Sequence, residues 1–311
     1  MNQNLKNYIK EFGLKTFLIS GSTRVLKNIL TEKQFEKYYE FKHNYLIQLL
    51  DKEYGSEVNK SNGDCSVKQN IKEDSPIWVF WLQGEDSMPS LVKACYKSIL
   101  NNAEKHTVIL LTKDNVREYV NLPEYIYEKL NSKKMLPAFF SDIVRENLLY
   151  EYGGVWMDAT MYMTASLPDE IYNYKYYTIK GVSPIWDWTT FFQASGKGNV
   201  FPKEVSHLFN CYWKNHDGAI TYLLFDCLFA VARKHNIDID EQIKKLPSKD
   251  NSIFIMLDEY IEAPYSEEII KMLNEKTSIH KLTYKVSYRE EINGKQTIWG
   301  HLLNEGIAKG D

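Results

Sequence analysis

Hydrophobic and polar positions predict alternating strands and helices from about residue 76 onward. The apolar runs 77–82 and 108–111 are short and continuous, which is typical of buried strands. Between them, residues 88–101 carry apolar side chains at helical spacing, and a helix-rich stretch follows to Asn131. Strands that alternate with helices predict a parallel, doubly wound sheet.

The stretch 137–164 has the clearest pattern in the chain: a helix, a glycine turn, a short strand and a carboxylate. The apolar residues at helical spacing are Phe139, Phe140, Ile143, Val144 and Leu148. Pro137 suits a first helical turn, and Gly153-Gly154 suits a helix end. Residues 155–157 then read as a strand, and Asp158 follows at its carboxyl end, where ligands collect in open α/β sheets.

Further elements are expected in the rest of the chain. Residues 176–182 and 189–194 resemble strands, and residues 201–215 and 218–234 resemble helices. Asp226 lies in the second of these helices among apolar residues, so it either faces a pocket or is a paired structural acid. A basic segment, 278–285, lies near the end of the sequence.

The first 75 residues differ in character from the rest. Residues 1–54 read as helical, and the polar stretch 55–75 as a loop or linker. We therefore expect a helical segment with its linker (1–75) and an α/β domain (76–311). Residues 1–50 have a charge balance of +4, so the helices either contact an anionic membrane or pack on the domain with a solvated basic face.

Composition excludes several classes of protein. A net charge of −3 gives no nucleic-acid signature. The four cysteines have no metal-site or disulfide-framework spacing, and we expect free thiols in a reducing compartment. The amino terminus lacks a signal-peptide core, and no apolar run approaches the length of a spanning helix. A cytoplasmic protein, soluble or bound peripherally at the inner face of the membrane, is expected.

The order of motifs resembles the nucleotide-sugar site of GT-A glycosyltransferases. These motifs are Ser141-Asp142-x-x-Arg145, then Gly153-Gly154, then Trp156-x-Asp158-Ala159-Thr160. The set is most similar to bacterial capsular polysaccharide synthesis proteins, and more distantly to the DXD-containing mannosyl- and galactosyltransferases and the glucosylating toxins. The resemblance implies an α/β, GT-A-like (Rossmann-like) mixed sheet flanked by helices. Many relatives carry a second Asp where this chain has Thr160.

The resemblance also implies roles for particular residues. Asp142 and Arg145 would hold the sugar and act in catalysis with Asp158. Lys281 would meet a phosphate as a point charge. The residues expected to contact substrate are Trp81, Gln83, Asp142, Arg145, Gly154, Trp156, Asp226, Lys281 and Trp299. For Trp81 and Gln83, a core tryptophan and a turn glutamine without substrate contact is an equally good interpretation.

A divalent cation, Mn²⁺ or Mg²⁺, is the implied cofactor. Asp158, Thr160 and His280 are its expected ligands. Because Thr160 contributes no charge, free metal should bind weakly and arrive mostly with the nucleotide.

The implied reaction moves a hexose from a UDP-sugar to a growing capsular or surface polysaccharide, with a lipid-linked oligosaccharide as acceptor. Glucose and galactose are the leading sugars. The resembled families usually retain the anomeric configuration, with the leaving phosphate taking the acceptor proton. No carboxylate in the sequence is identifiable as a general base.

Other interpretations remain open. Asp142 and Arg145, three residues apart on a helix, form an ordinary ion pair in the simplest reading. A haloacid-dehalogenase-type phosphotransferase needs Asp-x-Asp-x-Thr, and the run after Asp158 departs from it. A protein of the same fold that binds a nucleotide sugar or glycan without turnover is the main alternative.

Overall fold

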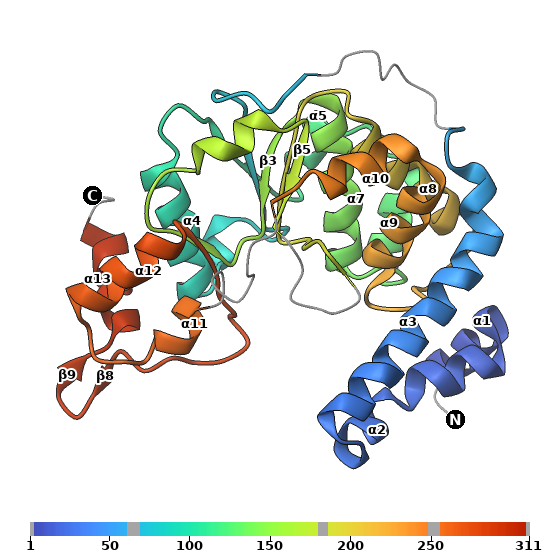
Figure 1. Cartoon of the computed structure of the whole chain (residues 1–311), viewed down its shortest axis with the longest axis horizontal. Helices are drawn as coiled ribbons and strands as arrows, with labels where there is room; N and C mark the ends of the chain where they lie inside the picture. The colour runs from blue at the N-terminus through green and yellow to red at the C-terminus, as the bar shows by residue number, and fades with distance from the viewer. Residues whose placement is uncertain (1–2, 61–68, 180–185, 248–255, 309–311) are drawn as a thin grey trace.

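A five-stranded sheet lies at the centre of the computed structural model, which describes residues 3–60, 69–179, 186–247 and 256–308. Its order is β2-β1-β3-β6-β5. The strands are β1 (Ile77–Phe80), β2 (Val108–Leu111), β3 (Gly154–Met157), β5 (Tyr176–Thr178) and β6 (Phe192–Ser195). Helices cover both sides of the sheet, with α4 and α11–α13 on one side and α7–α10 on the other (Figure 1). The predicted α/β class, with a mixed sheet flanked by helices, is confirmed.

The parallel sheet expected from the strand–helix alternation holds for only part of the structure. β1 pairs in parallel with both β2 and β3. β6 runs antiparallel to β3 and to β5, so the parallel pairing is limited to β2, β1 and β3 and the whole sheet is mixed. A parallel neighbour needs a crossover, usually a helix. The described residues between β5 and β6 form no helix, and the chain returns antiparallel.

Most of the helices of the α/β domain pack on one face of the sheet. On the α7 side lie α5 (Val116–Tyr119), α6 (Glu124–Asn131), α7 (Pro137–Glu151), α8 (Val200–Asn215), α9 (Leu224–His235) and α10 (Ile237–Lys244). Short 3-10 turns are η1 (Gly55–Glu57), η2 (Glu85–Ser87) and η3 (Asp169–Asn173). Helices α5–α10 share one continuous hydrophobic core with the sheet.

A second, smaller hydrophobic cluster organises the other side of the molecule. It includes Leu91 and Cys95 of α4 (Ser90–Asn102), Tyr162, and Trp299. The elements around it are β4 (Met161–Met163), α11 (Met256–Tyr260), α12 (Glu267–Lys276), β7 (Ile279–Lys281), β8 (Glu291–Ile292), β9 (Lys295–Gln296) and α13 (Ile298–Ala308). β4 pairs antiparallel with β7, which brings the basic segment next to the end of β3.

The N-terminal helices project from one end of the molecule (Figure 1). They are α1 (Gln3–Gly21), α2 (Thr23–Ile29) and α3 (Glu32–Tyr54). A capping box between Thr31 and Gln34 starts α3, and the last turns of α3 place Leu46, Leu50 and Tyr54 in the main core. The helical N-terminal segment is confirmed, and the end of α3 packs into the core of the α/β domain.

Two expectations concerned membrane-spanning segments and the cysteine thiols, and both bear on the residues that the structure describes. Within these residues, no helix combines the length and apolarity needed to cross a bilayer. Cys95, Cys211 and Cys227 are free thiols there, as expected, while Cys65 lies outside the described residues.

Candidate functional site

Asp158 lies directly after β3, at the carboxyl end of that strand, as the sequence predicts. Its backbone N–H donates to the Phe191 carbonyl at 2.9 Å, and its carbonyl accepts from Met161, which closes a tight turn. One carboxylate oxygen, Oδ1, accepts from the indole N–H of Trp156 at 3.1 Å. The turn and this bond orient a carboxylate whose side chain remains 36% exposed.

Lys281 occupies the other side of the same carboxylate. Its Nζ lies 2.9 Å from Asp158 Oδ2 and 2.7 Å from Thr160 Oγ1. The pairing of β4 with β7 sets Met161 opposite Lys281 and so places the ammonium beside a residue 123 positions earlier. The structure therefore brings Asp158, Thr160, Trp156 and Lys281 together.

Arg145 is a buried cation whose charge acts on Asp158, and its side chain is only 2% exposed. Its Nη2 lies 3.0 Å from Asp142 Oδ1, and its Nε donates to Glu146 Oε1 at 2.9 Å. Its Nη1 donates to the Thr190 carbonyl at 3.1 Å, and the Phe225 ring lies beneath the guanidinium. Nε and Nη1 donate to different acceptors, and Nη2 is ion-paired with the Asp142 carboxylate, so the guanidinium plane has a defined orientation.

Asp142 and Asp226 complete the group. The helix positions of Asp142 and Arg145, three apart on α7, give the ion pair that the spacing predicts. Asp226, on α9, accepts from the indole N–H of Trp188 at 2.9 Å. Asp226 is thus a satisfied buried acid, and its charge also acts on Asp142.

The electrostatics separate these carboxylates into two kinds. Burial raises the pKa of Asp142 to about 7, Arg145 opposes the rise, and the charges of Asp158 and Asp226 add to it. Burial likewise raises the pKa of Asp226 to about 6. For Asp158, burial acts upward, but the ammonium of Lys281 and the Arg145 guanidinium hold the pKa below its ordinary value. Asp158 is therefore the carboxylate that stays charged.

Two of the expected metal ligands fit a cation and one does not. Asp158 Oδ2 and Thr160 Oγ1 already converge on a single ammonium nitrogen, so the pair can hold a positive charge. His280 is 0% exposed, and neither ring nitrogen has a hydrogen-bond partner among the described residues. Successive residues of a strand point to opposite faces, so His280 points away when Lys281 points at Asp158. The placement of His280 beside Asp158 is wrong.

Two expected substrate contacts lie elsewhere. Gly154 is at the amino end of β3, about 10 Å from the carboxyl end by strand geometry. A Cβ there would lie 2.3 Å from the Pro76 carbonyl oxygen, so this glycine serves the close approach of two strands. Trp299 is buried on α13 in the second hydrophobic cluster, beside Tyr288. Gly154 therefore has a backbone role at the other end of the strand, and Trp299 has a packing role in the second hydrophobic cluster.

Trp81 and Gln83 lie just beyond the carboxyl end of β1. Trp81 is half-buried, donates to Ser87 Oγ at 3.0 Å and packs edge-on against Tyr284, while Gln83 is exposed. Their role in base contact stays a prediction.

Glu146 is a site residue that the sequence reasoning missed. Its side chain is 0% exposed, and burial raises its pKa to about 7 despite the adjacent Arg145. Its position three residues after Ile143 and three before Leu149 places it on the buried stripe of α7. In the sequence, this residue could have been found as a charged side chain at a position of the apolar stripe of the helix.

Together these features define a class of protein: an α/β protein with a charged aspartate, a lysine and a buried arginine gathered at the end of a parallel strand. Such a site suits phosphate and polyhydroxyl ligands. The chain belongs to the capsular polysaccharide synthesis protein family, whose sequence profile matches residues 25–302. This confirms the resemblance read from the motifs.

Two known proteins are similar to parts of the chain. An O-glycosyltransferase, braB, of Annulohypoxylon truncatum is 26% identical over 175 residues, which cover 49% of this chain. The match spans 40% of the length of that relative. The structure of the PaToxG glycosyltransferase is similar with a TM-score of 0.43 and 12% identity, covering 65% of this chain and 81% of that one.

Proposed function

We propose that this protein is a glycosyltransferase that moves a hexose, glucose or galactose, from a UDP-sugar to a growing capsular polysaccharide repeat unit. One observation carries the proposal. The charged Asp158 at the end of β3 binds Lys281 through Oδ2, and the buried ion pair of Arg145 with Asp142 acts on it by charge. Family membership and similarity to a named O-glycosyltransferase support the same conclusion.

The leaving UDP develops negative charge on its terminal phosphate, and this charge needs preorganised positive partners. Lys281 provides an ammonium whose side chain is 25% exposed, so it can turn from Asp158 to a phosphate. The oxygens of Asp158 and Thr160 would hold Mn²⁺ or Mg²⁺, since both ions take oxygen ligands. That ion would supply further charge neutralisation at the diphosphate.

The sugar requires groups that accept and donate hydrogen bonds. Asp142, 20% exposed, has an oxygen beyond the one paired with Arg145 and can accept from sugar hydroxyls. Arg145 holds Asp142 in place through the ion pair between their side chains. Asp226 is bonded to Trp188 and acts by its charge on Asp142, which favours the paired structural acid among the two alternatives.

The reaction proposed is retaining. The acceptor hydroxyl attacks from the side of the leaving group, the bond between the anomeric carbon and the phosphate oxygen breaks, and that oxygen takes the acceptor proton. This route requires no protein base. The protein's part is to position both substrates and to stabilise the diphosphate.

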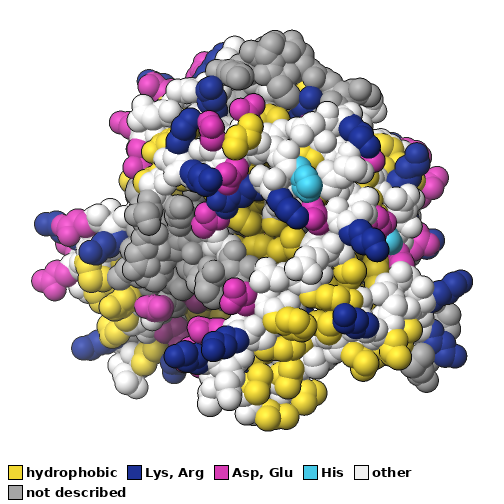
Figure 2. Space-filling model, turned by 45° about the vertical axis from the view of Figure 1, so that its right-hand side comes forward, with side chains coloured by type: hydrophobic (Ala, Val, Ile, Leu, Met, Phe, Trp, Pro, Cys, Tyr) yellow, Lys and Arg dark blue, Asp and Glu magenta, His cyan; other side chains and the backbone are white. Residues whose placement is uncertain are grey.

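The acceptor proposed is a lipid-linked oligosaccharide at the inner face of a bacterial membrane, reached through the N-terminal helices. Five large apolar side chains on α1–α3 are more than half exposed: Leu14, Leu18, Val25, Ile29 and Phe41. Figure 2 shows hydrophobic side chains gathered at the lower edge of the face on which these helices come forward, with Lys and Arg beside them. An exposed apolar face rimmed by cations suits an anionic bilayer.

The decisive test of the activity is a donor screen. Purified protein is incubated with each UDP-hexose, Mn²⁺ and a lipid-linked acceptor, and released UDP is measured. We expect release with one hexose and little with the others. UDP binding without release from any nucleotide sugar would favour the non-catalytic alternative, and neither binding nor release would refute the proposal.

Membrane contact is tested separately by co-sedimentation with anionic vesicles at low salt. Ile29→Glu should weaken sedimentation. Ile237→Glu is the matched control, because Ile237 on α10 is equally exposed at 69% but lies outside the N-terminal helices. Equal sedimentation of both variants, or none by the wild type, would remove this part of the proposal.

A further inference from the structure

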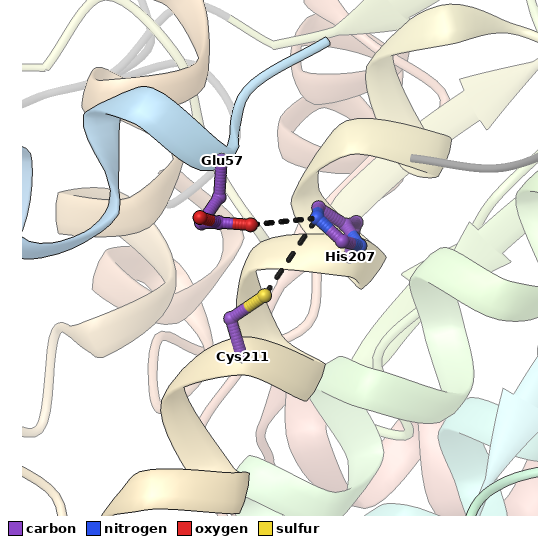
Figure 3. A group of neighbouring side chains, drawn as sticks. All are labelled: Glu57, His207 and Cys211. Carbon is purple, nitrogen blue, oxygen red and sulfur yellow. Dashed lines mark hydrogen bonds and ion pairs between the residues drawn. The ribbon is translucent and has the colours of Figure 1, made fainter. Parts of the chain in front are cut away.

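A carboxylate, an imidazole and a thiol converge away from Asp158, at the junction of η1 and α8 (Figure 3). His207 Nε2 lies 3.6 Å from Cys211 Sγ and 3.9 Å from Glu57 Oε2. The three ligand atoms all lie within 4.8 Å of one another, and all three side chains are partly exposed. An ion from solvent can therefore reach them.

The local structure explains why these side chains meet. His207 and Cys211 are four residues apart on α8, so they lie one above the other on the same helix face. Glu57 ends η1, the turn that follows α3. Its other carboxylate oxygen, Oε1, is 3.1 Å from Lys60 Nζ, which leaves Oε2 directed at His207.

The spacing matches a tetrahedral zinc centre. With Zn–N of about 2.0–2.1 Å and Zn–S of about 2.3 Å, tetrahedral geometry separates nitrogen and sulfur by about 3.6 Å and nitrogen and oxygen by about 3.4 Å. The observed 3.6 Å equals the first distance, and the observed 3.9 Å exceeds the second by a shift that a carboxylate rotation can supply.

The chemistry of the donors selects the metal. Thiolate and imidazole ligands favour Zn²⁺ over the hard ions Mg²⁺ and Ca²⁺, which take oxygen ligands. Three protein ligands leave one position for water or another small ligand. This set therefore differs in kind from Asp158 and Thr160, which are oxygen donors only.

We propose that Glu57, His207 and Cys211 form a zinc site that ties the end of the N-terminal helical segment to α8. The ion would join Glu57, which follows α3, to a helix that packs against α7, the helix carrying Asp142 and Arg145. Zinc would thus stabilise the attachment of the N-terminal helices to the α/β domain. This inference does not depend on the proposed transferase activity.

The test uses the full chain without an affinity tag, stripped of metal and then titrated with Zn²⁺ against a coloured chelator. We expect one ion per chain. Cys211→Ser and His207→Gln should each weaken binding at least tenfold, since loss of groups that merely support a ligand typically costs about 10- to 100-fold. Cys95→Ala is the matched thiol control and Asp158→Asn the control for the oxygen site; both should bind zinc as the wild type does.

Cobalt(II) gives a second readout that does not depend on affinity. The wild type and Cys95→Ala should show a thiolate-to-cobalt charge-transfer band, and Cys211→Ser, checked for folding by circular dichroism, should lack it. Zinc should also raise the unfolding temperature of the wild type and leave that of Cys211→Ser unchanged. Absence of binding, or binding that survives both ligand variants, would overturn the proposal and leave the cluster as a polar contact.

Discussion

Lys281 and a divalent metal ion should compete for the same two oxygens. The Lys281 ammonium lies 2.9 Å from Asp158 Oδ2 and 2.7 Å from Thr160 Oγ1, the donors proposed for the metal. A metal ion that binds the free protein must first displace it. Lys281→Met keeps most of the unbranched apolar stem and removes the ammonium with its charge and its hydrogen bonds. It should therefore tighten the binding of free Mn²⁺ and weaken the binding of UDP.

The magnitude follows from the pair's partial exposure, 25% for Lys281 and 36% for Asp158. Exposed ion pairs contribute about 0–1 kcal/mol, and hydrogen bonds to charged groups about 1.5–3 kcal/mol. We expect displacement to cost about 1–3 kcal/mol, so Lys281→Met should raise the affinity for free Mn²⁺ about 5- to 150-fold.

The assay is a Mn²⁺ titration followed by electron paramagnetic resonance, with and without UDP. Lys285→Met is the matched control, because Lys285 belongs to the same basic segment but is exposed. Its Mn²⁺ affinity should equal that of the wild type. If Lys281→Met binds free Mn²⁺ no more tightly than Lys285→Met does, the ammonium does not compete with the metal and the reasoning fails.

Four further predictions concern the same network. Asp158→Asn should reduce turnover about 10²- to 10³-fold, measured as UDP release, because the diphosphate loses charge stabilisation; wild-type turnover would contradict the site. Thr160→Asp should tighten Mn²⁺ binding in the same titration without necessarily raising turnover. Arg145→Lys cannot keep both hydrogen bonds and the ion pair of the guanidinium, and it should lower the free energy of unfolding by about 1–3 kcal/mol in urea; an unchanged midpoint would refute its positioning role. Asp226 has a folded-state pKa raised to about 6 from an ordinary 3.8, so the folded state binds the extra proton, and its contribution to stability is lost as pH rises between these values. Asp226→Asn should flatten that part of the stability–pH curve, and an unaltered slope would count against the shift.

Local rules in the sequence determined the central unit of this protein. Pro137 at the first turn, the apolar stripe of α7 and the positive-φ glycines at 153 and 154 specify a helix, its end and the strand that carries Asp158. Each of these rests on backbone or side-chain preferences that act over a few residues. The ion pair of Asp142 with Arg145 follows from helix geometry in the same way.

Tertiary structure alone decided which distant groups complete the site. The pairing of β4 with β7 sets Lys281, and not its neighbour His280, against Asp158, because strand register determines which residues share a face. The antiparallel return of β6 places Thr190 and Phe191 next to Arg145 and Asp158. Register and strand direction depend on the free energy of the whole packed sheet, and no short stretch of sequence contains that information.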